Sequence, residues 1–173
     1  MKANKIFLLS ILLFIYHNNL CVSSNYWVYF SPKDQISQKL VELINSAQEK
    51  IYLAVYFFTD LSVAKALIMA KNRNLDVQLV TDKNCLDYKY NKIEFLKDNG
   101  IEVFVFSTKK NSSPIMHNKF IILDKKVWTG SYNITRSAST RNQENVLCTD
   151  KKEVFNKYEK EFKRLKRLCL NIN

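Results

Sequence analysis

Short apolar runs alternate with amphipathic stretches between residues 31 and 106, and this alternation restricts the fold more than any other feature of the chain. The apolar runs are rich in β-branched and aromatic residues, which favours buried strands, whereas the stretches between them repeat apolar residues at helical spacing. The expected strands cover residues 50–58, 76–81 and 101–106. The expected helices after the first one cover residues 61–71 and 88–97. Such alternation predicts a mainly parallel sheet with helices on both faces.

The first helix is expected to begin at Ser31-Pro32-Lys33-Asp34. Serine is a frequent helix cap, proline fits the first helical position, and an acid suits the first turn. The residues that follow form an apolar stripe at helical spacing, made of Ile36, Leu40, Leu43, Ile44 and Ala47. We therefore expect an amphipathic helix directly after Ser31.

The pattern changes after a polar, basic loop at Thr108–Pro114. Residues 120–123 and 127–129 indicate two strands joined by a hairpin turn, and residues 145–148 indicate a last short strand. A C-terminal helix follows, with a mostly basic face opposite an apolar face made of Val154, Tyr158, Phe162, Leu165 and Cys169. At 173 residues the chain is expected to hold one core and one domain. We predict an α/β fold, an α-β-α sandwich with a mixed, mainly parallel central sheet.

The N-terminus predicts a signal peptide over residues 1–24, which leaves a domain over residues 25–173. Two lysines precede an apolar stretch over Ile6–Tyr16, and small residues up to Ser24 suit cleavage. The alternative is an uncleaved membrane anchor, although spanning a bilayer needs roughly 20 apolar residues and this stretch is shorter. We expect an exported protein, either periplasmic or secreted.

The chain carries a formal charge of +11, which falls to +9 without residues 1–24 because that segment holds two lysines and no acids. A strongly basic surface suits an anionic partner, either nucleic acid or an anionic phospholipid membrane. The expected domain contains Cys85, Cys148 and Cys169, whose spacings fit neither a disulfide framework nor a zinc site. One histidine remains beside them, so we expect no metal centre and no cofactor. Whether two of these cysteines form a disulfide stays open.

His117 and Lys119 are two residues apart at the start of an expected strand, so their side chains leave the same face. A neutral imidazole beside an ammonium suits attack on phosphorus, because the ammonium offsets the negative charge of a phosphodiester. A lone histidine is more often structural, and a lone lysine is usually solvated. The pairing of the two residues therefore carries the catalytic interpretation.

Gly130, Ser131 and Asn133 follow the hairpin and predict a tight turn whose backbone and side chains can donate hydrogen bonds to phosphate oxygens. Ser131 also has a simpler interpretation as a turn or helix-cap residue. Asp124 has the opposite parity along its strand from His117, so we expect it to fix the hairpin rather than contact substrate.

The pattern H-x-K-x4-D followed by G-S-x-N resembles the signature of the phospholipase D superfamily. The similarity extends over residues 26–150 and includes the segments AVYFFTD, DVQLVTD and RNQEN. It points to the small branch with one such motif per chain, which contains secreted bacterial endonucleases, bacterial phospholipases D and mitochondrial cardiolipin hydrolases. One departure is that five residues separate Asp124 from Gly130, where the family usually has six. A shorter hairpin changes the register of the second strand.

This resemblance implies that His117 is the nucleophile that forms a phosphohistidine intermediate and that Glu144 orients it. It also implies that Lys119 and Asn133 hold the phosphate, with Ser131 in support. Glu144 has a simpler interpretation as a surface acid. Single-motif members of the family pair as homodimers with the active site at the subunit interface. A second His117 would then protonate the leaving group.

We expect a phosphodiester hydrolase, and the leading hypothesis is a secreted nuclease of low sequence specificity that acts on DNA or RNA. The positive charge and the basic loop at Lys109–Ser113, just before His117, favour a polyanion. The alternative is a phospholipase D that hydrolyses phospholipid headgroups or cardiolipin, because anionic lipid surfaces also attract lysines. An inactive anion-binding module is a third hypothesis, which the intact pair of His117 and Lys119 disfavours.

Overall fold

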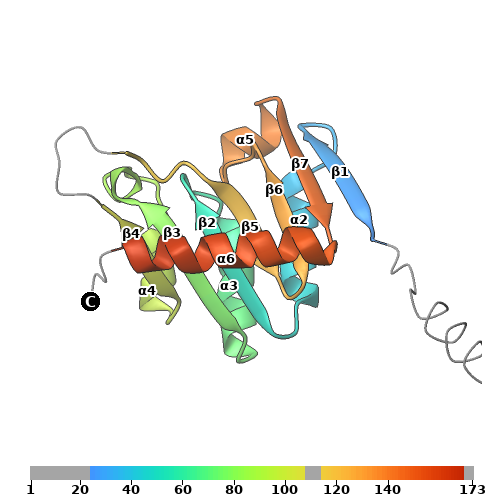
Figure 1. The fold of residues 1–173 in the computed structure, drawn as a ribbon. Coiled ribbons are helices and arrows are strands. Elements are labelled where there is room, and N and C mark those ends of the chain that lie inside the picture. Colours follow the sequence, from blue (N-terminus) through green and yellow to red (C-terminus); the bar gives the residue numbers. More distant parts are fainter. Residues whose placement is uncertain (1–23, 108–113, 170–173) are drawn as a thin grey trace, which may run out of the picture.

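The computed structural model describes residues 24–107 and 114–169, which form a seven-stranded sheet between helices (Figure 1). The strand order across the sheet is β1-β7-β6-β5-β2-β3-β4. In chain order the strands are β1 (Tyr26–Ser31), β2 (Lys50–Val55), β3 (Asp76–Asp82), β4 (Glu102–Phe106), β5 (Lys119–Leu123), β6 (Lys126–Gly130) and β7 (Glu144–Thr149). β2, β3 and β4 pair in parallel, and the other neighbouring strands pair antiparallel.

The predicted α-β-α sandwich with a mixed central sheet is confirmed. The sheet is mainly parallel by strand direction, because only β5 and β7 run against the other strands. It is not mainly parallel by pairing, since parallel contacts are confined to β2–β3 and β3–β4. The antiparallel part of the sheet begins where β5 pairs with β2, and a two-residue turn then places the consecutive strands β5 and β6 side by side.

The helices form one layer on each face of the sheet (Figure 1). α6 (Lys152–Leu168) crosses one face, where Phe162 and Leu165 pack against Ala54 and Phe120 of the sheet. A larger apolar cluster on the other face includes buried residues of the remaining helices. These helices are α2 (Ile36–Ser46), α3 (Leu61–Asn72), α4 (Ile93–Asp98) and α5 (Arg136–Thr140). Both faces of the sheet are therefore covered, as the near-continuous apolar strands require.

The structure corrects the start of the first helix. Ser31 is the last residue of β1, a strand absent from the prediction, and its hydroxyl accepts the Glu144 N–H. The Asp34 carboxylate accepts the Phe30 N–H and closes a turn, so the helix begins only at Ile36. The combination of serine, proline and acid here marks a turn after a strand rather than a helix cap.

The helix predicted over residues 88–97 is shorter in the structure, because a turn precedes it. Asn91 holds this turn: its Nδ2 donates to the carbonyl oxygens of Leu86 and Tyr88, and its Oδ1 accepts the Ile93 N–H. α4 therefore begins at Ile93. The short helix α5, capped by the Thr135 hydroxyl, was not predicted.

The predicted signal peptide at residues 1–24 and the loop at residues 108–114 lie almost entirely outside the described residues. Within residues 24–107 and 114–169, no helix is both long and apolar enough to cross a membrane. In that part of the chain Cys85, Cys148 and Cys169 are free thiols. Burial raises the pKa of each thiol to about 11, so all three stay protonated near neutral pH.

Candidate active site

The site residues predicted from the sequence come from strand ends that meet at one edge of the sheet. Lys119 opens β5 and pairs with Val55 at the end of β2. Gly130 ends β6 and pairs with Val146, near the start of β7. Because β5 and β7 run against β2 and β6, strand starts and strand ends alternate along this edge. This edge carries His117, Lys119, Ser131, Asn133 and Glu144.

The Lys119 ammonium lies against the His117 side chain. Its Nζ is 3.2 Å from Nδ1 and 3.3 Å from Nε2 of the imidazole, and it donates to the His117 carbonyl oxygen at 3.0 Å. The Tyr56 ring packs edge-on against the imidazole, with ring centroids 4.6 Å apart. His117 is exposed, whereas Lys119 and Tyr56 are half-buried. The imidazole, which can attack phosphorus, is therefore accessible beside a positive charge.

Partial burial also affects the charge of Lys119. Desolvation lowers the pKa of Lys119 below the ordinary value for lysine, while the negative charge of Glu144 opposes part of this shift. A partly desolvated ammonium attracts a phosphate more strongly than a fully hydrated one, because the local dielectric constant is lower. Glu144 thus helps to keep Lys119 protonated.

A buried carboxylate anchors the segment that leads into His117. Asp82, the last residue of β3, is 1% exposed, and its Oδ2 accepts the Met116 N–H at 2.7 Å. Its Oδ1 accepts the Asn84 N–H at 3.0 Å. Met116 is itself buried. The residue before His117 is therefore held both by packing and by a charge-assisted hydrogen bond.

Gly130 permits a close approach between β6 and β7. A Cβ at this position would collide with the carbonyl oxygen of Asn145, a backbone atom that cannot move alone. The Ser131 N–H donates to the same oxygen at 3.1 Å, so this N–H group is engaged within the sheet rather than offered to a phosphate. The short spacing after Asp124 is accommodated by the two-residue turn between β5 and β6.

Ser131 and Glu144 bond to each other rather than to His117. The Ser131 hydroxyl donates to one Glu144 oxygen at 2.5 Å and accepts the Asn145 N–H at 3.1 Å. The Asn142 Nδ2 donates to the other Glu144 oxygen at 3.0 Å. No hydrogen bond joins Glu144 to His117 within the described residues. The structure thus brings Glu144 to the same sheet edge without the direct contact implied by the resemblance.

Asn133 lies beside the end of β2. Its Oδ1 accepts the Phe57 N–H at 3.4 Å, which orients the amide. The next residue is fixed as well, because the carbonyl oxygen of Ile134 accepts the N–H groups of Thr59 and Asp60. The contact with Phe57 engages the amide oxygen, and the amide nitrogen is the group that can donate to a phosphate.

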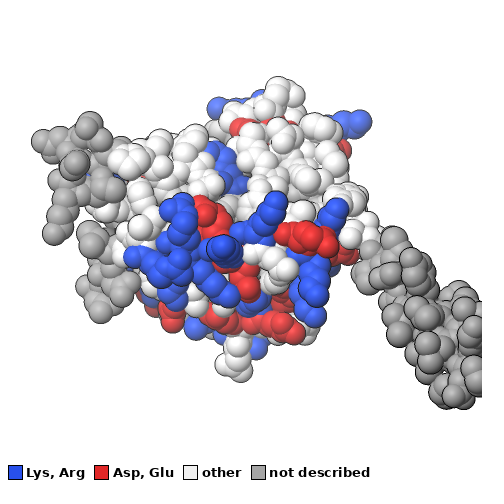
Figure 2. All heavy atoms as spheres, in the orientation of Figure 1, with Lys and Arg blue, Asp and Glu red and all other residues white. Residues whose placement is uncertain are grey.

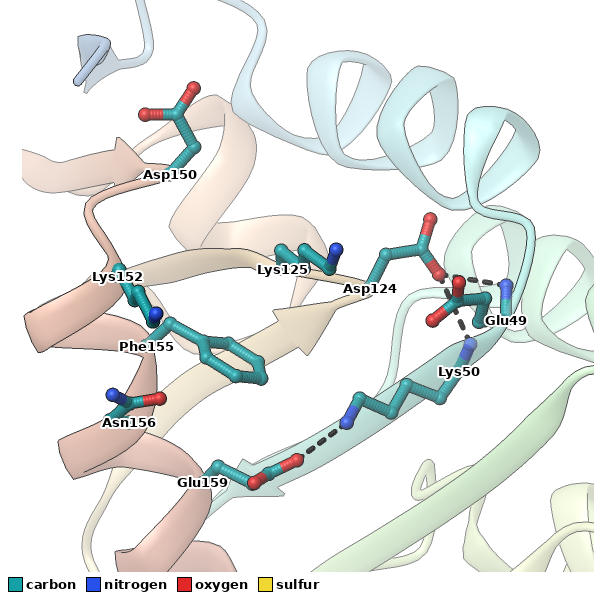
Figure 3. A pocket seen from close by; sticks show the side chains of 9 residues that line it. All are labelled: Glu49, Lys50, Asp124, Lys125, Asp150, Lys152, Phe155, Asn156 and Glu159. Atoms are coloured by element: carbon teal, nitrogen blue, oxygen red, sulfur yellow. Dashed lines mark hydrogen bonds and ion pairs between the residues drawn. The ribbon is translucent and has the colours of Figure 1, made fainter. Parts of the chain in front are cut away.

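Asp124 lies at the opposite edge of the sheet, in the turn between β5 and β6. Its carboxylate accepts the backbone N–H groups of Glu49 and Lys50 at 2.8 and 3.1 Å (Figure 3). It also accepts the Gln48 N–H at 3.0 Å. Burial raises the pKa of Asp124, but these N–H bonds outweigh burial, so the pKa lies below the ordinary value. The contacts tie the hairpin turn to the start of β2, away from the residues beside His117.

A cavity of about 430 Å³ also lies at this opposite edge (Figure 3). Phe155 of α6 lines it together with Asp124 and Lys125, and an ion pair between Lys50 and Glu159 lies along it. None of the catalytic candidates lines this cavity. Across residues 24–107 and 114–169, no three histidine, cysteine or acidic side chains gather as metal ligands would.

Two residues of the site edge, Tyr56 and Asp82, were missed by sequence reasoning. Tyr56 directly follows β2, and Asp82 ends β3. Ligands of α/β proteins commonly bind at the carboxyl ends of parallel strands. Polar and aromatic residues at the ends of the predicted parallel strands could therefore have identified Tyr56 and Asp82 as site residues.

Comparison with known proteins agrees with the fold and the motif. A family model described as cardiolipin synthase, PLD-like domain, matches residues 40–166. Phospholipase D of Rickettsia prowazekii is 35% identical over 136 residues, covering 78% of this chain and 64% of that protein. Mitochondrial cardiolipin hydrolase of Xenopus laevis is 36% identical over 130 residues, covering 75% of this chain and 60% of that protein. The chain thus spans less than two thirds of the length of these relatives.

A solved structure shows the same architecture. The phospholipase D family member Nuc from Salmonella typhimurium matches with a TM-score of 0.78 at 27% identity, covering 87% of this chain and 99% of that chain. The matching family model spans the whole segment from His117 to Glu144. The chain belongs to the phospholipase D superfamily, in the branch with one H-x-K motif per chain.

Proposed function

We propose that the chain is a metal-independent phosphodiester hydrolase in which His117 is the nucleophile. A ring nitrogen of His117 bonds to phosphorus while the bond to the leaving alkoxide breaks, and a second imidazolium protonates that alkoxide. Water then attacks the phosphohistidine, gives a proton to the second imidazole, and releases the phosphate product. The observation that carries this proposal is the Lys119 ammonium within 3.3 Å of both imidazole nitrogens.

The other site residues take supporting roles in this proposal. Lys119 and the Asn133 amide nitrogen hold the non-bridging phosphate oxygens and offset the charge that develops during attack. Glu144 orients His117 once substrate is bound, and Ser131 positions Glu144 through their short hydrogen bond. Glu144 also acts on Lys119 through its charge.

We also propose that two chains form the working enzyme. The two steps need one neutral histidine and one protonated histidine, and the chain offers a single candidate motif. His117 is exposed in the single chain, so a second copy can approach it. Light scattering should show a dimer, and a fully active monomer would contradict this arrangement.

Nucleic acid is the proposed substrate, and the protein is proposed to act after export. The formal charge of +9 that remains without residues 1–24 favours a polyanion. The basic surface of α6 contributes less than its composition suggests, because acids are interspersed with its lysines and arginines (Figure 2). Phospholipid is the second candidate, and the relatives named phospholipase D and cardiolipin hydrolase favour it.

The two substrates can be separated with one purified sample. Labelled DNA, labelled RNA and vesicles that contain cardiolipin are incubated with the protein in EDTA. Cleavage of nucleic acid alone supports the nuclease, and cleavage of lipid alone replaces it with the phospholipase. His117→Ala should abolish turnover of either substrate, whereas Lys125→Ala, a matched change at the opposite sheet edge, should not. A strict need for a divalent metal would overturn the phosphohistidine mechanism.

A further inference from the structure

A row of four aromatic rings leads from His117 to the protein surface. Tyr56 contacts the imidazole, and Phe57 contacts Tyr56 with ring centroids 4.5 Å apart. Tyr88 lies 5.6 Å from Phe57, and Tyr90 lies 6.0 Å from Tyr88. We call Tyr56, Phe57, Tyr88 and Tyr90 the aromatic path. It connects the candidate nucleophile to the turn between β3 and α4.

The outer end of the aromatic path is exposed yet held in place. Tyr88 is 47% exposed and Tyr90 is 60% exposed, so neither ring is needed to fill the core. Asn91 fixes the turn that carries them, through its bonds to Leu86, Tyr88 and Ile93. This turn replaces the first part of the predicted helix. A local departure from the sequence pattern that presents two exposed rings is typical of a functional surface.

The residues around these rings identify the ligand chemistry. The Lys89 ammonium lies 5.7 Å from the centre of the Tyr90 ring, and Lys83 and Asp87 are exposed nearby in the sequence. Exposed aromatic rings interleaved with lysine suit single-stranded nucleic acid, whose unpaired bases stack on the rings while lysine contacts the backbone. A narrow row of rings fits a single strand of nucleic acid better than a lipid bilayer, because a surface that binds a bilayer usually presents a broad apolar patch.

We propose that Tyr88 and Tyr90 form a subsite that stacks unpaired bases next to the scissile phosphate held at His117. This proposal rests on the proposed nuclease function and narrows it to single-stranded DNA or RNA. A duplex gains less from the subsite, because its bases are already paired and stacked. Base–aromatic stacking makes the subsite tolerant of sequence, since every base has an aromatic face.

Binding is tested in the His117→Ala background, which prevents cleavage of the probe. A short fluorescein-labelled single-stranded DNA is titrated with protein, and anisotropy gives the Kd. Tyr88→Ala and Tyr90→Ala should each raise the Kd about tenfold, with about a hundredfold rise in the double variant. Tyr90→Phe keeps the ring and should restore most of the affinity. Tyr26→Ala is the matched control, because Tyr26 is 53% exposed on the distant edge strand β1.

The outcomes separate the subsite from the proposed function. If the protein with His117 intact cleaves single-stranded DNA but the double variant binds it as tightly as the parent, the subsite is overturned and the nuclease stands. If no nucleic acid is cleaved but binding still depends on both rings, the subsite stands and the nuclease falls. Loss of binding to cardiolipin vesicles, with DNA binding retained, would assign the rings to lipid and overturn the subsite.

Discussion

The Asp82 carboxylate accepts the Met116 N–H at 2.7 Å, and this bond joins the end of β3 to the residue before His117. The two residues are 34 positions apart in the chain, so the contact exists only in the folded sheet. Asp82 touches no reacting atom of the proposed mechanism. It is therefore a positioning residue, which fixes where the imidazole enters the site.

Asp82→Asn tests this positioning role. A carboxylate can accept the N–H groups of Met116 and Asn84 at once, whereas the amide must turn its NH2 group toward one of these donors. We expect kcat to fall about tenfold to hundredfold with a smaller change in KM, because the nucleophile is misplaced after substrate has bound. Steady-state kinetics of both variants, with Asp76→Asn at the other end of β3 as control, provide the measurement. A loss of activity that only matches the loss of folded protein would leave Asp82 with a structural role.

Asp124 contributes to stability in a pH-dependent manner. Its folded pKa is below the ordinary value, so its contribution is present above the unfolded pKa of about 3.9 and is lost as pH falls through the folded pKa. Asp124→Asn should lower the free energy of unfolding near neutral pH by about 1–3 kcal/mol, because backbone N–H groups of the α2–β2 loop lose their acceptor. Urea unfolding at pH 7 and at pH 3 should show that the difference in free energy of unfolding between the parent protein and Asp124→Asn is smaller at pH 3. A difference that stays constant, or one equal to that of the exposed Asp87→Asn, would contradict the assignment.

A methyl group added at each of the two glycines is expected to destabilise the protein, but only the one at Gly130 should also reduce activity. Gly130→Ala places the methyl group against the Asn145 carbonyl oxygen, so β6 and β7 must separate. We expect a loss of about 3 kcal/mol in stability and a loss of activity in the fraction that stays folded, because Ser131 and Glu144 flank this contact. Gly100→Ala meets no atom within 4 Å and only strains a backbone with φ of +79°. It should cost about 1–2 kcal/mol with activity per folded molecule retained. Equal activity of the two folded variants would refute the Gly130 argument.

Local sequence predicts most of the sheet, because strands buried on both faces appear as near-continuous apolar runs. β2, β3 and β4 follow the predicted ranges to within a few residues. β1 was not predicted, since its pairing partner β7 lies at the other end of the chain and Tyr26, Val28 and Phe30 stay exposed. The helix start predicted at Ser31 was wrong because β1 was not recognised. Serine, proline and an acid can cap a helix, but after a strand the same residues close a turn.

The proximity of His117 and Lys119 could be predicted because it is local in the sequence. The contacts of the site that depend on strand order could not. His117 and Lys119 are two residues apart, so the period of a strand brings them together whatever the topology. The contact between Tyr56 and His117 exists because β5 pairs with β2. The bond between Ser131 and Glu144 likewise depends on how β6 pairs with β7, and within the described residues it engages Glu144 in place of a hydrogen bond to the imidazole.

The lowered pKa of Lys119 predicts the alkaline limit of activity. Burial disfavours the ammonium, so Lys119 loses its proton at a lower pH than an ordinary lysine, whose pKa is about 10.4. If phosphate binding needs the ammonium, then kcat/KM should fall as the pH is raised, and the fall should begin at a lower pH than the pKa of an ordinary lysine would give. Glu144→Gln removes a charge that raises the pKa, so the fall should move to still lower pH. Lys119→Arg should remove this alkaline fall in kcat/KM, because a guanidinium keeps its proton throughout that pH range. The measurement is a pH–rate profile with a short labelled oligonucleotide, with Lys125→Arg at the opposite sheet edge as control. If kcat/KM of Lys119→Arg falls at the same alkaline pH as that of the parent protein, the fall belongs to another group. The proposed role of the Lys119 charge would then be wrong.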